Sequence, residues 1–326
     1  GLQVLADEFS AVGDEAYVPT TDSVEAGLFL LEDFHLDDLT LEFGLRGDYV
    51  ERDPDAVRGE KEDFVNFSIS GAALWDLGDG WTTGMALSRA ERAPSTEELY
   101  SNIDAQTEAD LVVHGATGLI EIGDAEMDEE VSQNVDLSLT WQGDRSFVQV
   151  AVFYNYFEDY IFLFNTGQES DETPIYQYAQ EDADFYGLEL TSDIHLLNTH
   201  GGDLSLRVTG DAIRGEFDES GDVPRLPTER IGASLQWNTD NLGAWIGVQR
   251  ATNQDRQGEF ETETDGYTRW DLGADYTLEL SGDQEMLFFV KWKNFTDEEI
   301  RLSTSFLRNV APEAGASLEA GLRYTF

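Results

Sequence analysis

Cysteine is absent from this chain of 326 residues, which excludes disulfides and any metal site built on thiolates. Basic residues are few: 19 Lys and Arg stand against 67 Asp and Glu, and the formal net charge is −48. A general affinity for nucleic acid is excluded, because binding to phosphates depends on Lys and Arg. The carboxylates are spread along the whole chain, which favours adaptation to a saline habitat over acidic loops that concentrate cations.

Long apolar runs are also absent. No segment approaches the ~18 consecutive apolar residues of a membrane-spanning helix. The first ten residues, GLQVLADEFS, lack the basic start and the apolar centre of a signal peptide. The sequence contains no G-x-S-x-G, Walker loop, H-E-x-x-H or EF-hand string. We therefore predict that the protein is not an enzyme and has no resident cofactor.

Alternation of apolar and polar residues recurs along the chain and is clearest at its end. In residues 316–326, ASLEAGLRYTF, every second residue from Leu318 to Phe326 is apolar, whereas the intervening positions include Glu319 and Arg323. This pattern suits a strand with lipid on one side and a wet lumen on the other. The last strand of a soluble β-sandwich is the alternative.

The connections between these segments alternate between short and long. Short turns rich in Gly, Asn and Asp, as hairpins require, fall at residues 35–38, 78–80, 142–144, 198–202, 238–241 and 281–283. Longer, polar connections fall at residues 53–61, 93–130, 165–174, 218–227, 253–266 and 296–315. An outer-membrane barrel has this asymmetry, whereas a sandwich has no reason to sort its connections by side. We predict an all-β fold with about fourteen antiparallel strands of a transmembrane β-barrel.

Several segments resemble, in the same order, the motifs of TonB-dependent outer-membrane receptors. Residues 87–100, LSRAERAPSTEELY, resemble the family's R-A-P-S-x-x-E-L signature. Residues 123–137, GDAEMDEEVSQNVDL, resemble its G-N/D-P-x-L-x-x-E-x-S-x-N-x-E motif, with Ala125 in place of Pro and Met127 in place of Leu. ADFYGLE at 183–189, VKWKNFTDE at 290–298 and the closing YTF follow. The positions that we expect to have structural roles are Arg92, Ala93, Pro94, Glu98, Leu99, Gly123, Asp124, Glu130, Asn134, Asn294 and Phe326.

This resemblance implies a fold, a location and partners. Family members combine a plug domain and a TonB box with a barrel of about twenty-two strands, so we expect residues 1–326 to be the C-terminal portion of such a barrel, a fragment without the plug. The implied location is the outer membrane of a Gram-negative bacterium, in contact with its lipid. The implied partners are the TonB–ExbB–ExbD complex, reached through the N-terminal region, and the barrel-assembly machinery, reached through the last strand.

The ligand implied by the resemblance is a scarce metal ion or a metal chelate. AYVPTT at residues 16–21 and TSFLRNVAP at 304–312 are similar to the branch that takes up zinc and related metals. We expect ligand contacts in the loop at residues 93–130, where His114 and neighbouring carboxylates suit zinc or a similar ion. A solvated acidic loop and an oxygen-only calcium site are the alternatives. The candidate contacts are Glu97, Glu98, Tyr100, Glu121 and Asp124, with His114 as the metal ligand.

The other three histidines, His35, His195 and His200, fall at short turns, where we expect solvated side chains. Two other functions stay open. A passive outer-membrane pore or structural barrel would act without TonB and hold no ligand tightly. A soluble, secreted β-sandwich binding module would need no membrane.

Overall fold

The computed structural model describes residues 1–13, 15–199, 201–280, 282 and 284–326. These residues form 17 strands in one sheet, an α-helix, α1 (Thr96–Tyr100), and a 3-10 helix at Glu108–Asp110. In this part of the chain, no helix has the length and apolar character needed to cross a membrane. A sandwich consists of two packed sheets, so the soluble sandwich kept as an alternative is wrong.

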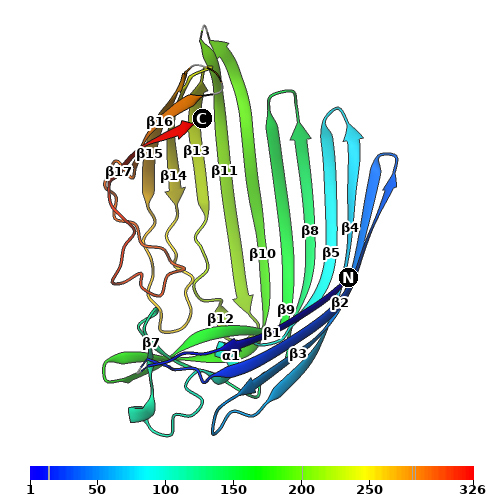
Figure 1. Cartoon of the computed structure of the whole chain (residues 1–326), viewed down its shortest axis with the longest axis vertical. Coiled ribbons are helices and arrows are strands. Elements are labelled where there is room, and N and C mark those ends of the chain that lie inside the picture. Colours follow the sequence, from blue (N-terminus) through cyan, green and yellow to red (C-terminus); the bar gives the residue numbers. More distant parts are fainter. Residues whose placement is uncertain (14, 200, 281, 283) are drawn as a thin grey trace.

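Fourteen strands pair in chain order as an antiparallel meander, the number that the sequence predicts. Figure 1 shows that they form an open, curved wall. They are β1 (Leu2–Phe9), β2 (Thr21–Leu36), β3 (Leu39–Pro54), β4 (Glu62–Gly78), β5 (Trp81–Arg92), β8 (Glu130–Gln142), β9 (Phe147–Ser170), β10 (Thr173–Thr199), β11 (Gly202–Phe217), β13 (Arg230–Asn238), β14 (Leu242–Ala251), β15 (Thr268–Glu279), β16 (Glu285–Lys293) and β17 (Ser317–Thr325).

Three short strands belong to the connections. β6 (Val113–His114) pairs with β7 (Leu119–Ile122), and β7 in turn lies parallel to β10. β12 (Gly221–Asp222) pairs with the end of β11. These strands therefore fasten two of the long connections to the wall.

Short turns and long loops lie at opposite ends of the wall, as predicted, with the hairpin turns at the upper end in Figure 1. The turn between β4 and β5 shows why the short ones need their residues, because Gly78, Asp79 and Gly80 all have a positive φ of 51° to 81°. The predicted turns at 198–202 and 281–283, and with them His200, include positions outside the described residues. A further long connection, residues 10–20, joins β1 to β2.

The connection between β9 and β10 differs from the prediction. Instead of a loop over residues 165–174, a two-residue turn at Asp171 and Glu172 joins the strands, and both residues have positive φ, 48° and 66°. The strands are 24 and 27 residues long, whereas about 9–11 residues cross a bilayer. The hairpin therefore projects well beyond the neighbouring strands at the long-loop end.

The two faces of the wall have opposite chemistry. Met85, Leu137, Val152 and Leu188 lie side by side on successive strands and are all exposed. One position along, the other face carries small or polar residues such as Gly84, Ser138, Ala151 and Glu189. The alternation seen in the sequence thus sorts residues into an apolar face and a polar face.

The largest hydrophobic core lies at the long-loop end rather than along the wall. There the loops pack against β3, β4 and β9. The buried members of this core are Val18, Val50, Phe64, Leu99, Tyr100, Met127 and Ile161. The core holds the connections of the first half of the chain as a folded cap on the wall.

Candidate functional site

The RAPSTEEL segment forms the start of helix α1. Ser95 is the N-cap: its Oγ accepts a hydrogen bond from the Glu98 backbone N–H (3.2 Å), and the Glu98 carboxylate accepts one from the Ser95 N–H (2.7 Å). This reciprocal pair satisfies two N–H groups that a helix start leaves without partners. Pro94, Leu99 and Tyr100 are buried behind it. The segment therefore anchors the loop at residues 93–130 to the wall.

Arg92 joins the two motifs that the sequence singled out. Its guanidinium donates to the Glu98 carboxylate (2.8 Å) and to the Glu130 carboxylate (3.1 Å). Glu130 also accepts a hydrogen bond from the Ile161 backbone N–H (2.9 Å), which ties β8 to β9. Glu98 is thus engaged by both a helix cap and an ion pair.

The other motif positions also serve the framework. A Cβ on Gly123 would lie 2.7 Å from the backbone of Leu99 and Ser101, so only glycine allows this crossing of the chain. Three of these side chains make hydrogen bonds: Asn134 donates to Ser88 Oγ, Asn294 bonds with the backbone N–H and carbonyl of Glu298, and Asp124 accepts from the N–H of Glu126. Ala93 packs against the cap core, and the Phe326 ring stacks on Tyr324.

His114 lies in a small, partly buried network. Its Nδ1 is 3.0 Å from the Glu121 carboxylate, its Nε2 is 3.4 Å from the Tyr17 hydroxyl, and its ring stacks on Tyr17 with centroids 4.4 Å apart. Thr117 Oγ1 donates to the same carboxylate, whose side chain is only 3 % exposed. Among the described residues, no three His, Asp or Glu side chains gather as metal ligands would. Zinc binding by His114 therefore stays a prediction.

The remaining candidates are not brought together around an open space. Tyr100 is fully buried, with its hydroxyl donating to the Glu60 carbonyl (2.9 Å). Glu97 and Glu121 flank Tyr17, and burial followed by these two carboxylates raises the pKa of Tyr17 well above its usual range. The structure thus places the predicted ligand contacts in and around the cap, where most have protein partners.

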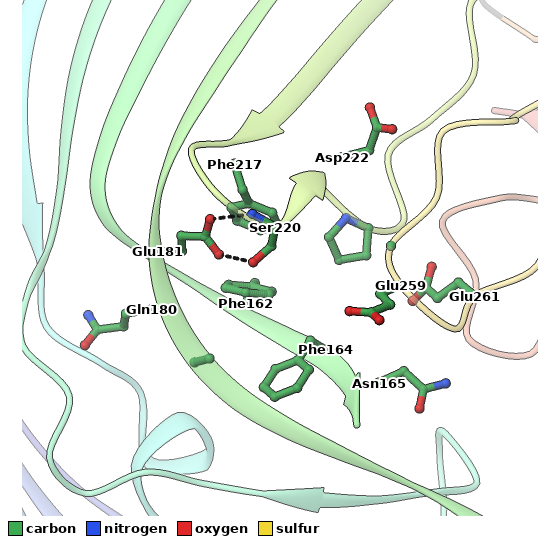
Figure 2. Close-up of a pocket in the computed structure, with 13 residues that line it drawn as sticks. Phe162, Phe164, Asn165, Gln180, Glu181, Phe217, Ser220, Asp222, Glu259 and Glu261 are labelled. Atoms are coloured by element: carbon green, nitrogen blue, oxygen red, sulfur yellow. Dashed lines mark hydrogen bonds between the residues drawn. The ribbon is translucent and has the colours of Figure 1, made fainter. Parts of the chain in front are cut away.

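A cavity that the sequence did not reveal lies on the other side of the projecting hairpin. It has a volume of about 260 Å³, is open to solvent on one side and is lined by β9, β10, the end of β11 and the loops at residues 218–229 and 252–267. Figure 2 shows Phe162, Phe164 and Phe217 on one side of it and Glu259 on the other. One signal was present in the sequence: the aromatic residues of β9 continue beyond the length that a bilayer requires.

Ion pairs fasten the loops around this cavity. Glu261 lies 2.6 Å from Arg225 and 3.3 Å from Arg308, and its side chain is 2 % exposed. Arg225 also donates to the Leu163 carbonyl and lies over the Phe306 ring, 4.4 Å from its centroid. This clamp, Arg225, Glu261 and Arg308, connects three long loops with β9.

The geometry agrees with comparisons to known proteins. A family profile described as "TonB dependent receptor-like, beta-barrel" matches residues 4–296. The fold is similar to that of the copper transporter OprC (TM-score 0.74, 16% identity) and of the FrpB iron transporter from Neisseria meningitidis, F3-3 variant (0.68, 16%). It is also similar to that of the siderophore receptor PirA from Acinetobacter baumannii (0.65, 17%).

These likenesses cover 94% of the chain but only 48%, 46% and 46% of the respective structures, so the chain spans about half the length of the structures it matches. The named proteins are transporters and receptors, and the prediction that the chain is not an enzyme is confirmed. Since the family profile covers nearly the whole meander, the chain belongs to the TonB-dependent receptors and forms part of their β-barrel.

Proposed function

We propose that the protein is an active-transport receptor that takes up a scarce metal ion or metal chelate and is energised through TonB. The observation that carries this proposal is the division of the molecule into an apolar-faced wall and a folded, polar cap at one end. A passive pore needs no such cap. The names of the copper, iron and siderophore proteins with the same fold give the ligand class its support.

In this proposal the wall is scaffold and pore lining, and the cap and cavity meet the ligand. TonB-dependent receptors are proteins of the Gram-negative outer membrane, so the exposed apolar face is the one that meets lipid. The TonB–ExbB–ExbD complex would drive uptake, and the barrel-assembly machinery would insert the wall through β17. The loop contacts Glu97, Glu98, Tyr100, Glu121, Asp124 and His114 remain part of the proposal.

Uptake measurements test this function. Cells that express the full-length protein would be given radiolabelled iron, copper or zinc, as free ions and as chelates, with and without a working tonB gene. We expect at least one of these metals to accumulate only when both the receptor and tonB are intact. Accumulation that survives loss of tonB would instead establish the passive pore.

A further inference from the structure

One side of the cavity beside the projecting hairpin is lined by aromatic rings. The rings of Phe162 and Phe217 lie 4.3 Å apart between centroids, and Phe162 and Phe164 lie 6.0 Å apart. All three rings line the cavity together with Pro224. Aromatic faces carry partial negative charge and attract cations as well as apolar groups. This aromatic side of the cavity therefore suits a ligand that is both apolar and positively charged.

The opposite side of the cavity is acidic. In Figure 2 the carboxylate of Glu259 is directed toward the cavity, whereas that of Asp222 is directed away. Two other carboxylates have protein partners: Glu181 accepts from the backbone N–H groups of Glu219 (2.7 Å) and Ser220 (2.8 Å), and Glu261 belongs to the clamp. Within the described residues, Glu259 forms no ion pair and accepts no hydrogen bond. Glu259 is therefore the carboxylate of this cavity that can interact with a bound cation.

Two contacts place the loop that carries the exposed Glu259 beside the cavity. A Cβ on Gly258 would lie 2.9 Å from Cβ of Pro224, so glycine allows the two loops to touch. On the other side, the Phe260 ring packs over Gly167 in β9, and the Phe260 carbonyl accepts a hydrogen bond from Asn165 (3.4 Å). Contacts on both sides of Glu259 thus position its backbone at the edge of the cavity.

The surrounding loops reinforce the negative potential. Residues 218–229 and 252–267 contain nine Asp and Glu but two Arg. Among the residues that the structure describes, no lysine or arginine side chain lines the cavity, and Arg225 is engaged in the clamp. An anionic chelate would meet repulsion without a cationic partner, whereas a cation would replace solvent between Glu259 and the aromatic rings.

We propose that this cavity binds the positively charged, partly apolar portion of the transported chelate, so that the protein selects cationic chelates over anionic ones. The inference rests on the proposed uptake function for its biological ligand. The cavity itself is defined by the rings of Phe162, Phe164 and Phe217 and by the carboxylate of Glu259. Its preference for a cation can therefore be measured without TonB.

Calorimetric titration of the detergent-solubilised full-length protein tests this preference with three probes that share a benzene ring and differ in charge: benzyltrimethylammonium, benzyl alcohol and benzoate. We expect the cation to bind at least about tenfold more tightly than the neutral and anionic probes. Glu259→Gln should weaken the cation about tenfold and leave benzyl alcohol unchanged. Phe164→Leu keeps an apolar side chain without the π face, and should also weaken the cation more than the alcohol.

Glu263→Gln is the matched control, because it removes the same charge from the same loop at a residue that does not line the cavity. Equal weakening by Glu259→Gln and Glu263→Gln, or benzoate binding as tight as that of the cation, would overturn the cation site. If the unmodified protein supports no TonB-dependent uptake in cells but keeps its cation preference in detergent, the transport function is refuted and the binding site is not.

Discussion

At the scale of single residues, the family motifs work mainly through the backbone. Gly123 is required because the chain crosses Leu99 and Ser101 too closely for a side chain, and Ser95 and Glu98 are required to begin α1. The sequence predicted structural roles for Gly123, Glu98 and Asp124, and the structure gives each of them a framework contact. It also predicted ligand contacts for Glu98 and Asp124, and these stay predictions. A motif string gives residue identity, whereas the partner of each side chain depends on contacts between segments distant in sequence.

Gly123→Ala tests the crossing. The added Cβ would meet backbone atoms, which cannot rotate away, so we expect a destabilisation of about 1–3 kcal/mol, in the range of overpacked cores. Thermal unfolding and the rate of proteolysis within residues 93–130 measure it. Gly47→Ala is the control, since its Cβ would find its nearest neighbour at 4.0 Å. Equal effects from the two substitutions would refute the close crossing.

Tyr17 makes the stability of the cap sensitive to high pH. Burial, followed by the charges of Glu97 and Glu121, raises its pKa above the ordinary value of 10.0. Because the folded pKa is the higher one, this group contributes stability that is complete below the unfolded pKa and is lost as the pH rises through the folded pKa. The phenolate absorbance that Tyr17→Phe removes should therefore appear only well above pH 10.0. If the phenolate of Tyr17 appeared at the ordinary pKa, the partly buried position beside Glu97 and Glu121 would be refuted.

At the scale of elements, the meander could be predicted but the projecting hairpin could not. Period-two alternation and turn residues fix strands and short turns locally. The extension of β9 and β10 depends instead on packing: Leu163 and Tyr176 are buried against Leu119 in β7 on one side, and Phe162 packs against Phe217 and Val223 on the other. Such partners come from loops whose course local patterns do not determine. The cavity was missed for the same reason.

The clamp around Glu261 is the element-scale contact most open to test. Glu261→Gln leaves Arg225 and Arg308 buried without their carboxylate, and removing one partner of a buried pair costs about 3–5 kcal/mol. We expect the loops at residues 218–229, 252–267 and 294–316 to become susceptible to protease together, while the wall keeps its strand content. Glu263→Gln in the same loop should change stability by less than about 0.5 kcal/mol. Separate responses of the three loops would contradict a shared clamp.

At the scale of the whole molecule, charge is the property that neither the fold nor the family requires. The family explains the apolar face and the alternation of turns and loops, but not a formal net charge of −48. Among the described residues, most arginines already form an ion pair with a carboxylate, for example Arg92 with Glu98 and Arg207 with Asp193. With 67 acids against 19 basic residues, most carboxylates have no such partner, and their mutual repulsion opposes the folded state.

A saline habitat, which stays a prediction, would remove this repulsion by screening. The Debye length falls from about 10 Å at 0.1 M salt to about 3 Å at 1 M, less than the spacing of many surface charges. We therefore expect the melting temperature of the detergent-solubilised protein to rise between these two NaCl concentrations. Sucrose at matched osmolality is the control, because it favours compact states without screening charge. If sucrose raises the melting temperature as much as NaCl does, exclusion of solute from the surface explains the gain, and the acidic composition is no adaptation to salt.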